Sequence, residues 1–436
     1  MKKRLLYVDF FRGFFIVYII WLHAFNAVVY NNDPQSIDNA NPWIFVILAP
    51  LVIMATWAPI FVFLSGTAHA YSMHQTLLNY NRIRSITPEL NKSLLGGLVN
   101  SFLLIFYSFI NMTFFHHRMP FNGRFYETLI TGYIWKGAFP DFSIDILFYT
   151  DALGNIGISL FFLHITLYAL WRSGELFDRR YTFRVLSGIG FTLLFISPVI
   201  HNSLDPIFYQ SIQDKNWVVS WVLKFLLAPL PNMAYGYLGA VFGIALSERV
   251  ELHKIKWYGY SVGGVLVFIA CAIINSEGLA PSEFANSPLP IKIQILDAGL
   301  IVILTTLFIS LMEYTTEEKR KWWAEHTIFF RRISMVALTI FILEGPVAVT
   351  LGRLYLLIIG SPSEFPKNPL YIIPFIMLVL LFWYFVAKLW EKIGFKYGAE
   401  WLSVQIVGWF RNRKSLRLDP AYALYHRSKY ASIREE

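Results

Sequence analysis

Residues 10–30 of the chain read FFRGFFIVYIIWLHAFNAVVY. The stretch is apolar except for a few side chains, chiefly Arg12 and His23, and it has the length of about 20 residues that an α-helix needs to cross a bilayer. It is too long for the hydrophobic part of a signal peptide, and it lacks a convincing small-residue cleavage site. The stretch therefore predicts a first transmembrane helix.

Apolar runs of similar length recur along all 436 residues, of which 56% are hydrophobic and only 15% charged. Soluble domains carry roughly 25% charged residues, so this composition excludes an ordinary soluble protein. We predict an all-α integral membrane protein with a single bundle of about ten transmembrane helices. The further spans are expected at residues 42–70, 94–115, 146–171, 183–200, 217–246, 257–274, 291–312, 333–360 and 370–390. The second, sixth and ninth spans contain Pro or Gly and are expected to be kinked or broken.

The lysine and arginine residues indicate the orientation, because basic residues accumulate in loops on the cytoplasmic side. Residues 31–41 have none, whereas the loop after the second span carries Arg82, Arg84 and Lys92. Basic residues return in every second loop and in the tail, with a weaker fit after the third span. Both termini are therefore expected in the cytoplasm. The net charge of +9 is then explained by topology rather than by binding to nucleic acid.

The chain is expected to divide near residue 392. Residues 1–392 form the predicted transmembrane domain, and residues 393–436 form an amphipathic, basic cytoplasmic segment. In this segment Trp401, Leu402, Trp409 and Phe410 precede a basic run, a pattern typical of a helix in the membrane interface.

Ionisable side chains inside a bilayer are energetically costly, so they are functional candidates. Asp9 and Arg12 are spaced i,i+3 and can pair on one face of the first helix. His23 lies eleven residues after Arg12, on the same face and about 16 Å further along the axis. Glu344 lies in the ninth span, where its carboxyl group can hydrogen-bond His23 or the acceptor, with a buried structural hydrogen bond as the alternative. A histidine there can take a proton from a hydroxyl or amine or carry an acyl group, although a structural hydrogen bond is the alternative.

The string VDFFRG at residues 8–13, with His23 eleven residues after the arginine, resembles the first-helix signature of the membrane-bound acyltransferase superfamily. This superfamily includes heparan-alpha-glucosaminide N-acetyltransferase and the bacterial acyltransferase-3 O-acetyltransferases. Five further segments resemble its motifs in the same order. They are PIFVFLSG at 59–66, SLLGGLVN at 93–100, DALGNIG at 151–157, MVALTIFIL at 335–343 and YGAEWL at 397–402, with Ala399 where a proline is expected.

The resemblance implies transfer of an acyl group, typically acetyl, from acetyl-CoA on the cytoplasmic side to a hydroxyl or amine of a carbohydrate or lipid-linked glycan. His23 matches the catalytic histidine, and Arg12 matches an arginine that is essential in part of the superfamily. Two routes are open, direct transfer with His23 as general base or an acyl-His23 intermediate. The closing motif is found in bacterial relatives, which implies a bacterial cytoplasmic membrane.

Several other residues are weaker candidates. Asp151 is expected at the outer start of the fourth span, where it either orients an acceptor hydroxyl or caps the helix. Arg82, Arg84 and Lys92 are candidate contacts for the phosphates of CoA, against the alternative of ordinary cytoplasmic-loop residues.

The remaining histidines and buried charges suggest structural roles. His116 and His117 are expected to be solvated, and no metal site is expected, because no further ligands stand at suitable spacing. His164, Lys224 and Asp297 lie inside spans and are expected to be paired structurally.

Two other classes of function compete with the enzyme. In a proton-coupled transporter of an amphiphile or organic anion, Arg12 binds the substrate and His23 carries protons. The second class is a non-catalytic scaffold. Charged side chains inside the membrane count against it, because no function would offset their energetic cost.

Overall fold

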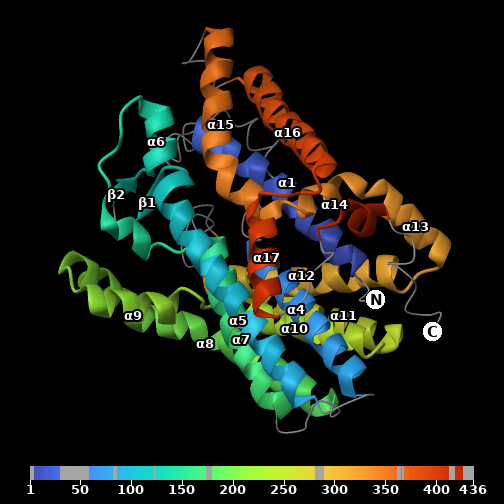
Figure 1. Ribbon diagram of the computed structural model, residues 1–436. Coiled ribbons are helices and arrows are strands. Elements are labelled where there is room, and N and C mark those ends of the chain that lie inside the picture. Colours follow the sequence, from blue (N-terminus) through green and yellow to red (C-terminus); the bar gives the residue numbers. More distant parts are fainter. Residues whose placement is uncertain are drawn as a thin grey trace.

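The computed structural model describes residues 4–29, 58–81, 86–121, 124–172, 179–279, 289–360, 365, 368–411 and 418–425. Within these residues the chain is almost wholly helical (Figure 1), and its one sheet is a hairpin of β1 (Met119–Phe121) and β2 (Arg124–Tyr126). One continuous hydrophobic core joins helices from both ends of the chain. The predicted all-α architecture is confirmed.

Nine segments of the described chain are long and apolar enough to cross a membrane, and each corresponds to an expected span. They identify a multi-pass membrane protein. They are α1 (Leu6–Ala24), α5 with η2 (Thr87–Ile110, Asn111–Phe115), α7 (Ala152–Arg172), α8 (Arg179–Gln213), α9 with α10 (Trp217–Leu227, Asn232–Ser247), α11 (Leu252–Glu277), α12 with η6 (Ile291–Phe308, Ile309–Glu313), α15 (Ala337–Ile359) and α16 (Pro369–Lys392).

The expected span at 42–70 lies partly outside the described residues. Its described part opens α4 (Pro59–Asn81), which continues beyond the expected end. Polar side chains of α4 face α10 on both sides of the expected end. Thr67 donates to the carbonyl oxygen of Gly239 at 2.9 Å, and His74, in the continuation, bonds Ser247.

Proline breaks some of the spans. The sixth is interrupted between α9 and α10, at Pro229 and Pro231, as expected. The ninth is not broken at Pro346, which lies within α15. The interruption comes earlier, between α14 (Ile328–Ser334) and α15. In addition, α8 continues as helix through Pro206 to Gln213, where a loop was expected.

Close contacts at glycines reveal the relative directions of the helices. Gly13 of α1 lies against the carbonyl oxygen of Phe330, and Val28, in η1 (Phe25–Val29), lies against Gly352. The first span therefore runs parallel to α14 and α15. Contacts of the same kind make α4 parallel to α10, and make α5 antiparallel to α7 and α11 antiparallel to α12. All four relations agree with a chain that crosses back and forth in the expected order.

A small cap follows the third span. It contains η2, the hairpin, α6 (Leu129–Lys136) and η3 (Ile144–Phe148), and it lies beside α15 in Figure 1. Thr128 and Thr131 donate to the carbonyl oxygens of His116 and Phe115 at 2.6 and 2.7 Å. These bonds fix the backbone that presents the histidine pair.

The C-terminal segment packs against the bundle. In α17 (Ala399–Phe410), Glu400 accepts hydrogen bonds from the backbone nitrogens of Leu338 and Thr339, at the start of α15. In η7 (Ala421–Tyr425), the carbonyl oxygen of Leu424 accepts a bond from Arg331 at 2.5 Å. The 335–343 and 397–402 motifs are thus in direct contact.

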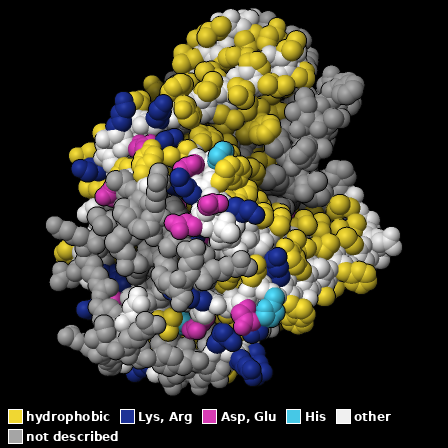
Figure 2. All heavy atoms as spheres, turned by 90° about the vertical axis from the view of Figure 1, so that its right-hand side faces the viewer, with side chains coloured by type: hydrophobic (Ala, Val, Ile, Leu, Met, Phe, Trp, Pro, Cys, Tyr) yellow, Lys and Arg dark blue, Asp and Glu magenta, His cyan; other side chains and the backbone are white. Residues whose placement is uncertain are grey.

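The expected cytoplasmic loop between α12 and α15 is more ordered than a solvated basic loop. Arg320, in α13 (Glu317–His326), donates to Glu313 at 2.6 Å, and both side chains are buried. Arg331 is 1% exposed. Figure 2 shows charged side chains gathered on one face below a mainly hydrophobic lobe. In Figure 1, α15 and α16 lie at the top of the molecule, and α16 carries exposed apolar residues such as Leu370 and Leu389.

Candidate active site

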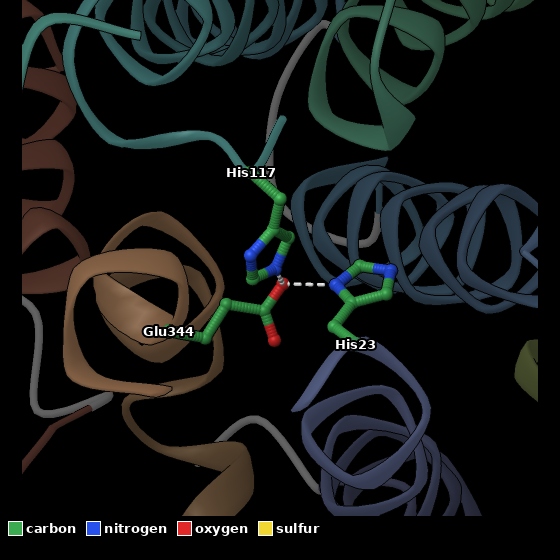
Figure 3. Close-up of side chains that lie close together, drawn as sticks. All are labelled: His23, His117 and Glu344. Atoms are coloured by element: carbon green, nitrogen blue, oxygen red, sulfur yellow. Dashed lines mark hydrogen bonds and ion pairs between the residues drawn. The ribbon is translucent and has the colours of Figure 1, made fainter. Parts of the chain in front are cut away.

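His23 and Glu344 meet where α1 and α15 run side by side. Nδ1 of His23 is hydrogen-bonded to Oε1 of Glu344 (Figure 3). The Glu344 side chain is 6% exposed and that of His23 is 28% exposed. The contact is the one expected from the sequence, while the catalytic roles of both residues stay a prediction.

His117 is the third member of this cluster, and the expectation that it is solvated is wrong. It is 4% exposed, and its Nε2 lies 3.8 Å from Oε1 of Glu344. The rings of His23 and His117 stand nearly perpendicular, with centroids 5.1 Å apart. Burial lowers the pKa of His117. The neighbouring His23 lowers it further, while the nearby carboxylate of Glu344 raises it.

A glycine brings the cap to α15. Gly345 lies so close to the carbonyl oxygen of Phe115 that a Cβ there would be 2.2 Å from it. The missing side chain lets η2 approach α15, and His117 follows two residues later. The sequence does carry a signal for this meeting, because the first and third spans both end on the same side of the membrane, which brings His23 and His117 to one side.

The cluster prepares His23 to accept a proton. A carboxylate that binds Nδ1–H holds the imidazole in the tautomer whose Nε2 has a free lone pair. In Figure 3 the second nitrogen of His23 points away from Glu344, and it has no hydrogen-bond partner among the described residues. The same carboxylate stabilises the imidazolium that forms.

The expected pair between Asp9 and Arg12 is not formed. Both carboxylate oxygens of Asp9 are bound by Arg4, through Nε and Nη2 at 2.7 Å each. The planar guanidinium of Arg4 aligns with both oxygens at once, and a bidentate pair of this kind is stronger than a single charged hydrogen bond. Arg12 is half-buried and has no hydrogen bond or ion pair in the described part of the chain. Its cation remains available to a ligand.

Asp151 acts as a helix cap. Its carboxylate accepts hydrogen bonds from Ser108 at 2.6 Å, from Asn111 at 3.0 Å and from the backbone nitrogen of Gly154 at 2.9 Å. These donors fix the start of α7 against α5. Asp151 is buried, outside the histidine cluster, so the alternative of a capping residue describes it better than a catalytic one.

The candidate CoA contacts are separated from the cluster. Lys92 is exposed near the start of α5, whereas His117 follows η2, whose end lies about 35 Å further along the axis. Arg82 and Arg84 lie outside the described residues.

Other buried polar residues make structural contacts elsewhere. His164 bonds the carbonyl oxygen of Leu160 at 2.6 Å and the ring of His69 at 3.2 Å. Lys224 donates to the carbonyl oxygen of Tyr149 at 3.2 Å. Asp297 is 2% exposed in α12. The structural pairing expected for His164 and Lys224 is confirmed.

Comparisons of the chain with protein families, curated proteins and solved structures found no match. The functional argument therefore depends on the geometry of the site. Its central feature is a carboxylate that two imidazoles face, held between helices of a membrane bundle.

Proposed function

We propose that the protein is a membrane-bound acyltransferase. It moves an acyl group, in the first instance acetyl, from a CoA thioester to a hydroxyl or amine of a carbohydrate or envelope glycan. The observation that supports this most directly is the hydrogen bond between Glu344 and Nδ1 of His23, which leaves Nε2 free. We place both termini in the cytoplasm and the protein in a bacterial cytoplasmic membrane.

The proposed step is general base catalysis. Nε2 of His23 takes the proton of the acceptor as its oxygen or nitrogen attacks the thioester carbonyl. The carbon–sulfur bond then breaks, CoA leaves as a thiolate, and the proton on His23 returns to that thiolate or to water. Glu344 stabilises the intermediate imidazolium. A covalent acyl-His23 route uses the same nitrogen as the nucleophile, and both routes fit the geometry.

Arg12 is the proposed anchor for the anionic donor. It lies on the same helix as His23, about 16 Å nearer to the N-terminus, and Asp9 is already occupied by Arg4. A phosphate of CoA would supply a direct ion-pair partner, which Arg12 does not have among the described residues. Lys92, with Arg82 and Arg84, would contact the donor nearer to the membrane surface.

The test is transfer of label from radiolabelled acetyl-CoA to a panel of carbohydrate acceptors by the purified protein. His23→Ala should lower the rate by about 10²–10⁴-fold. His326→Ala, which removes an exposed histidine of α13, should leave the rate unchanged. Full activity of His23→Ala would refute the assigned site. A wild-type protein that binds no donor but moves a solute across vesicles would instead support the transporter.

A further inference from the structure

The cluster at the active site has the composition of a metal site. Nδ1 or Nε2 of His23 and His117 and one oxygen of Glu344 all lie within 4.8 Å of one another. They come from three separate elements, α1, the loop after η2, and α15. We propose that His23, His117 and Glu344 bind one divalent transition-metal ion of the zinc class.

The first support is a set of buried atoms without partners. Both ring nitrogens of His117 and Oε2 of Glu344 are buried, and none has a hydrogen-bond partner in the described part of the chain. Leaving a buried polar atom unsatisfied costs about 1–3 kcal/mol. The 3.8 Å between His117 and Glu344 is too long for a hydrogen bond. An ion between them would satisfy Nε2 of His117 and a carboxylate oxygen together.

The second support is the chemistry of the ligands. Two imidazoles and a carboxylate favour zinc, cobalt or nickel, whereas magnesium and calcium prefer sites built from oxygen. Two histidines and a glutamate also form a recurrent zinc site with an open fourth position.

The geometry needs only a small adjustment. Ligand atoms about 2.0–2.2 Å from a tetrahedral zinc ion lie about 3.4 Å apart. The separation of 3.8 Å between His117 and Glu344 is close to this. His23 must exchange its hydrogen bond to Glu344 for the ion, so Nδ1 loses its proton and Nε2 takes one up from solvent, and the ring stays neutral in its other tautomer. His23 is the most exposed of the three side chains, so the ion can enter from its side.

This inference goes beyond the proposed function. An imidazole that binds an ion through Nδ1 keeps its proton on Nε2 and cannot act as a base. Zinc would therefore block acyl transfer by the mechanism proposed above. Binding itself requires neither the donor nor the acceptor, so it can be measured independently of transfer.

The experiment is titration calorimetry with zinc chloride on the full-length protein in detergent, stripped with a chelator and freed of any histidine tag. We expect one ion per chain. His117→Ala and Glu344→Gln should each raise the Kd by at least about tenfold, the range known for disturbed metal sites. His116→Ala, which removes the adjacent imidazole, should leave the Kd unchanged. Heats measured in two buffers of different ionisation enthalpy should agree, because the change of tautomer at His23 releases no net proton.

A second measurement reports the ligands directly. Cobalt should give the visible absorption bands of a tetrahedral complex in the wild type, and His117→Ala should lose them. Magnesium in excess should not displace cobalt. His117→Gln, which is closer in size, replaces His117→Ala if the latter elutes as an aggregate in size-exclusion chromatography.

Absence of saturable zinc binding at micromolar concentrations, or binding that neither His117→Ala nor Glu344→Gln weakens, would overturn the inference. Transfer activity in a protein that binds no zinc would overturn the metal site alone. Intact zinc binding, together with no transfer to any acceptor by the same protein after it has been stripped of metal, would leave the metal site standing and count against the proposed enzyme.

Discussion

At the scale of single residues, the buried carboxylates differ in how completely their oxygens are bonded. Both oxygens of Asp151 accept bonds from fixed donors, and Glu400 accepts bonds at the start of α15. Oε2 of Glu344 has no partner in the described chain. A carboxylate whose two oxygens both accept hydrogen bonds stabilises the local structure. A carboxylate with an unbonded oxygen beside two imidazoles can instead accept a proton or bind a ligand. This difference separates Glu344 from the other acidic candidates.

Asp151→Ala should lower stability and leave the chemistry intact. The substitution removes the hydrogen-bond acceptor of Ser108, of Asn111 and of the backbone nitrogen of Gly154. We therefore expect the free energy of unfolding to fall by about 1–3 kcal/mol. Asp151→Asn should lose less, because its amide oxygen still accepts. Unfolding in detergent measures the first effect, and transfer per folded molecule the second. A strong loss of transfer at unchanged stability would restore Asp151 as a catalytic residue.

Glu400 should make stability depend on pH. Loss of water around this half-buried carboxyl raises its pKa above the ordinary 4.5, although Thr339 and backbone N–H groups oppose the shift. The folded state then favours the protonated form, so this contribution is complete below pH 4.5 and is lost as the pH rises through the folded pKa. As the pH rises through this range, the unfolding free energy of Glu400→Gln should fall less than that of the wild type. Equal declines in both proteins would contradict the assignment.

At the scale of helices and loops, glycines set which elements touch. Gly66 and Gly239 let α4 and α10 pack backbone to backbone, as small residues do between membrane helices. Gly345 does the same between α15 and η2. These contacts decide the distances between side chains that lie far apart in sequence.

Gly345→Ala should disrupt the histidine cluster without changing any of its members. The new Cβ would lie 2.2 Å from the carbonyl oxygen of Phe115, so η2 and α15 must separate. Overpacking of this kind typically lowers stability by about 1–3 kcal/mol. We also expect transfer to fall, because displacement of α15 disturbs the hydrogen bond between Glu344 and His23. Gly188→Ala is the matched control, since Gly188 faces open space in α8. Equal activity of the two variants would show that the cap position is not critical.

At the scale of the whole molecule, helix directions are mutually consistent. α1 runs parallel to α15, and neighbouring spans such as α11 and α12 run antiparallel, as alternating crossings require. The cap and His117 then lie on the side opposite the N-terminus. Arg12 and the histidine cluster are therefore offset along the membrane normal.

Labelling single cysteines in sealed vesicles should reveal this arrangement. In a Cys271→Ser background, Lys92→Cys and Lys321→Cys are expected to react with an impermeant maleimide from the cytoplasmic side. Phe139→Cys, at a residue 72% exposed beyond α6, should react only from the opposite side. The reason is that an odd number of crossings separates Phe139 from each of the two lysines. Labelling of all three from one side would contradict the alternation.

The fold was largely readable from the sequence because hydropathy acts locally. Twenty apolar residues in a row can satisfy their backbone in lipid only as a helix, so nine expected spans appear as helices near their expected bounds. The ends were less predictable. α8 continues through Pro206, and α4 carries polar residues that α10 covers, because tertiary contacts there outweigh local preference.

The sequence by itself determined the membrane class, the spans and the first-helix residues Arg12 and His23, since these depend on composition and on spacing within one helix. The tertiary structure alone decided that Arg4 takes Asp9 from Arg12, that Asp151 caps α7, and that His117 joins Glu344. The physical reason is distance along the chain. His117 and Glu344 are 227 residues apart in the sequence, so their contact depends on how the helices pack. No pattern within either segment predicts it.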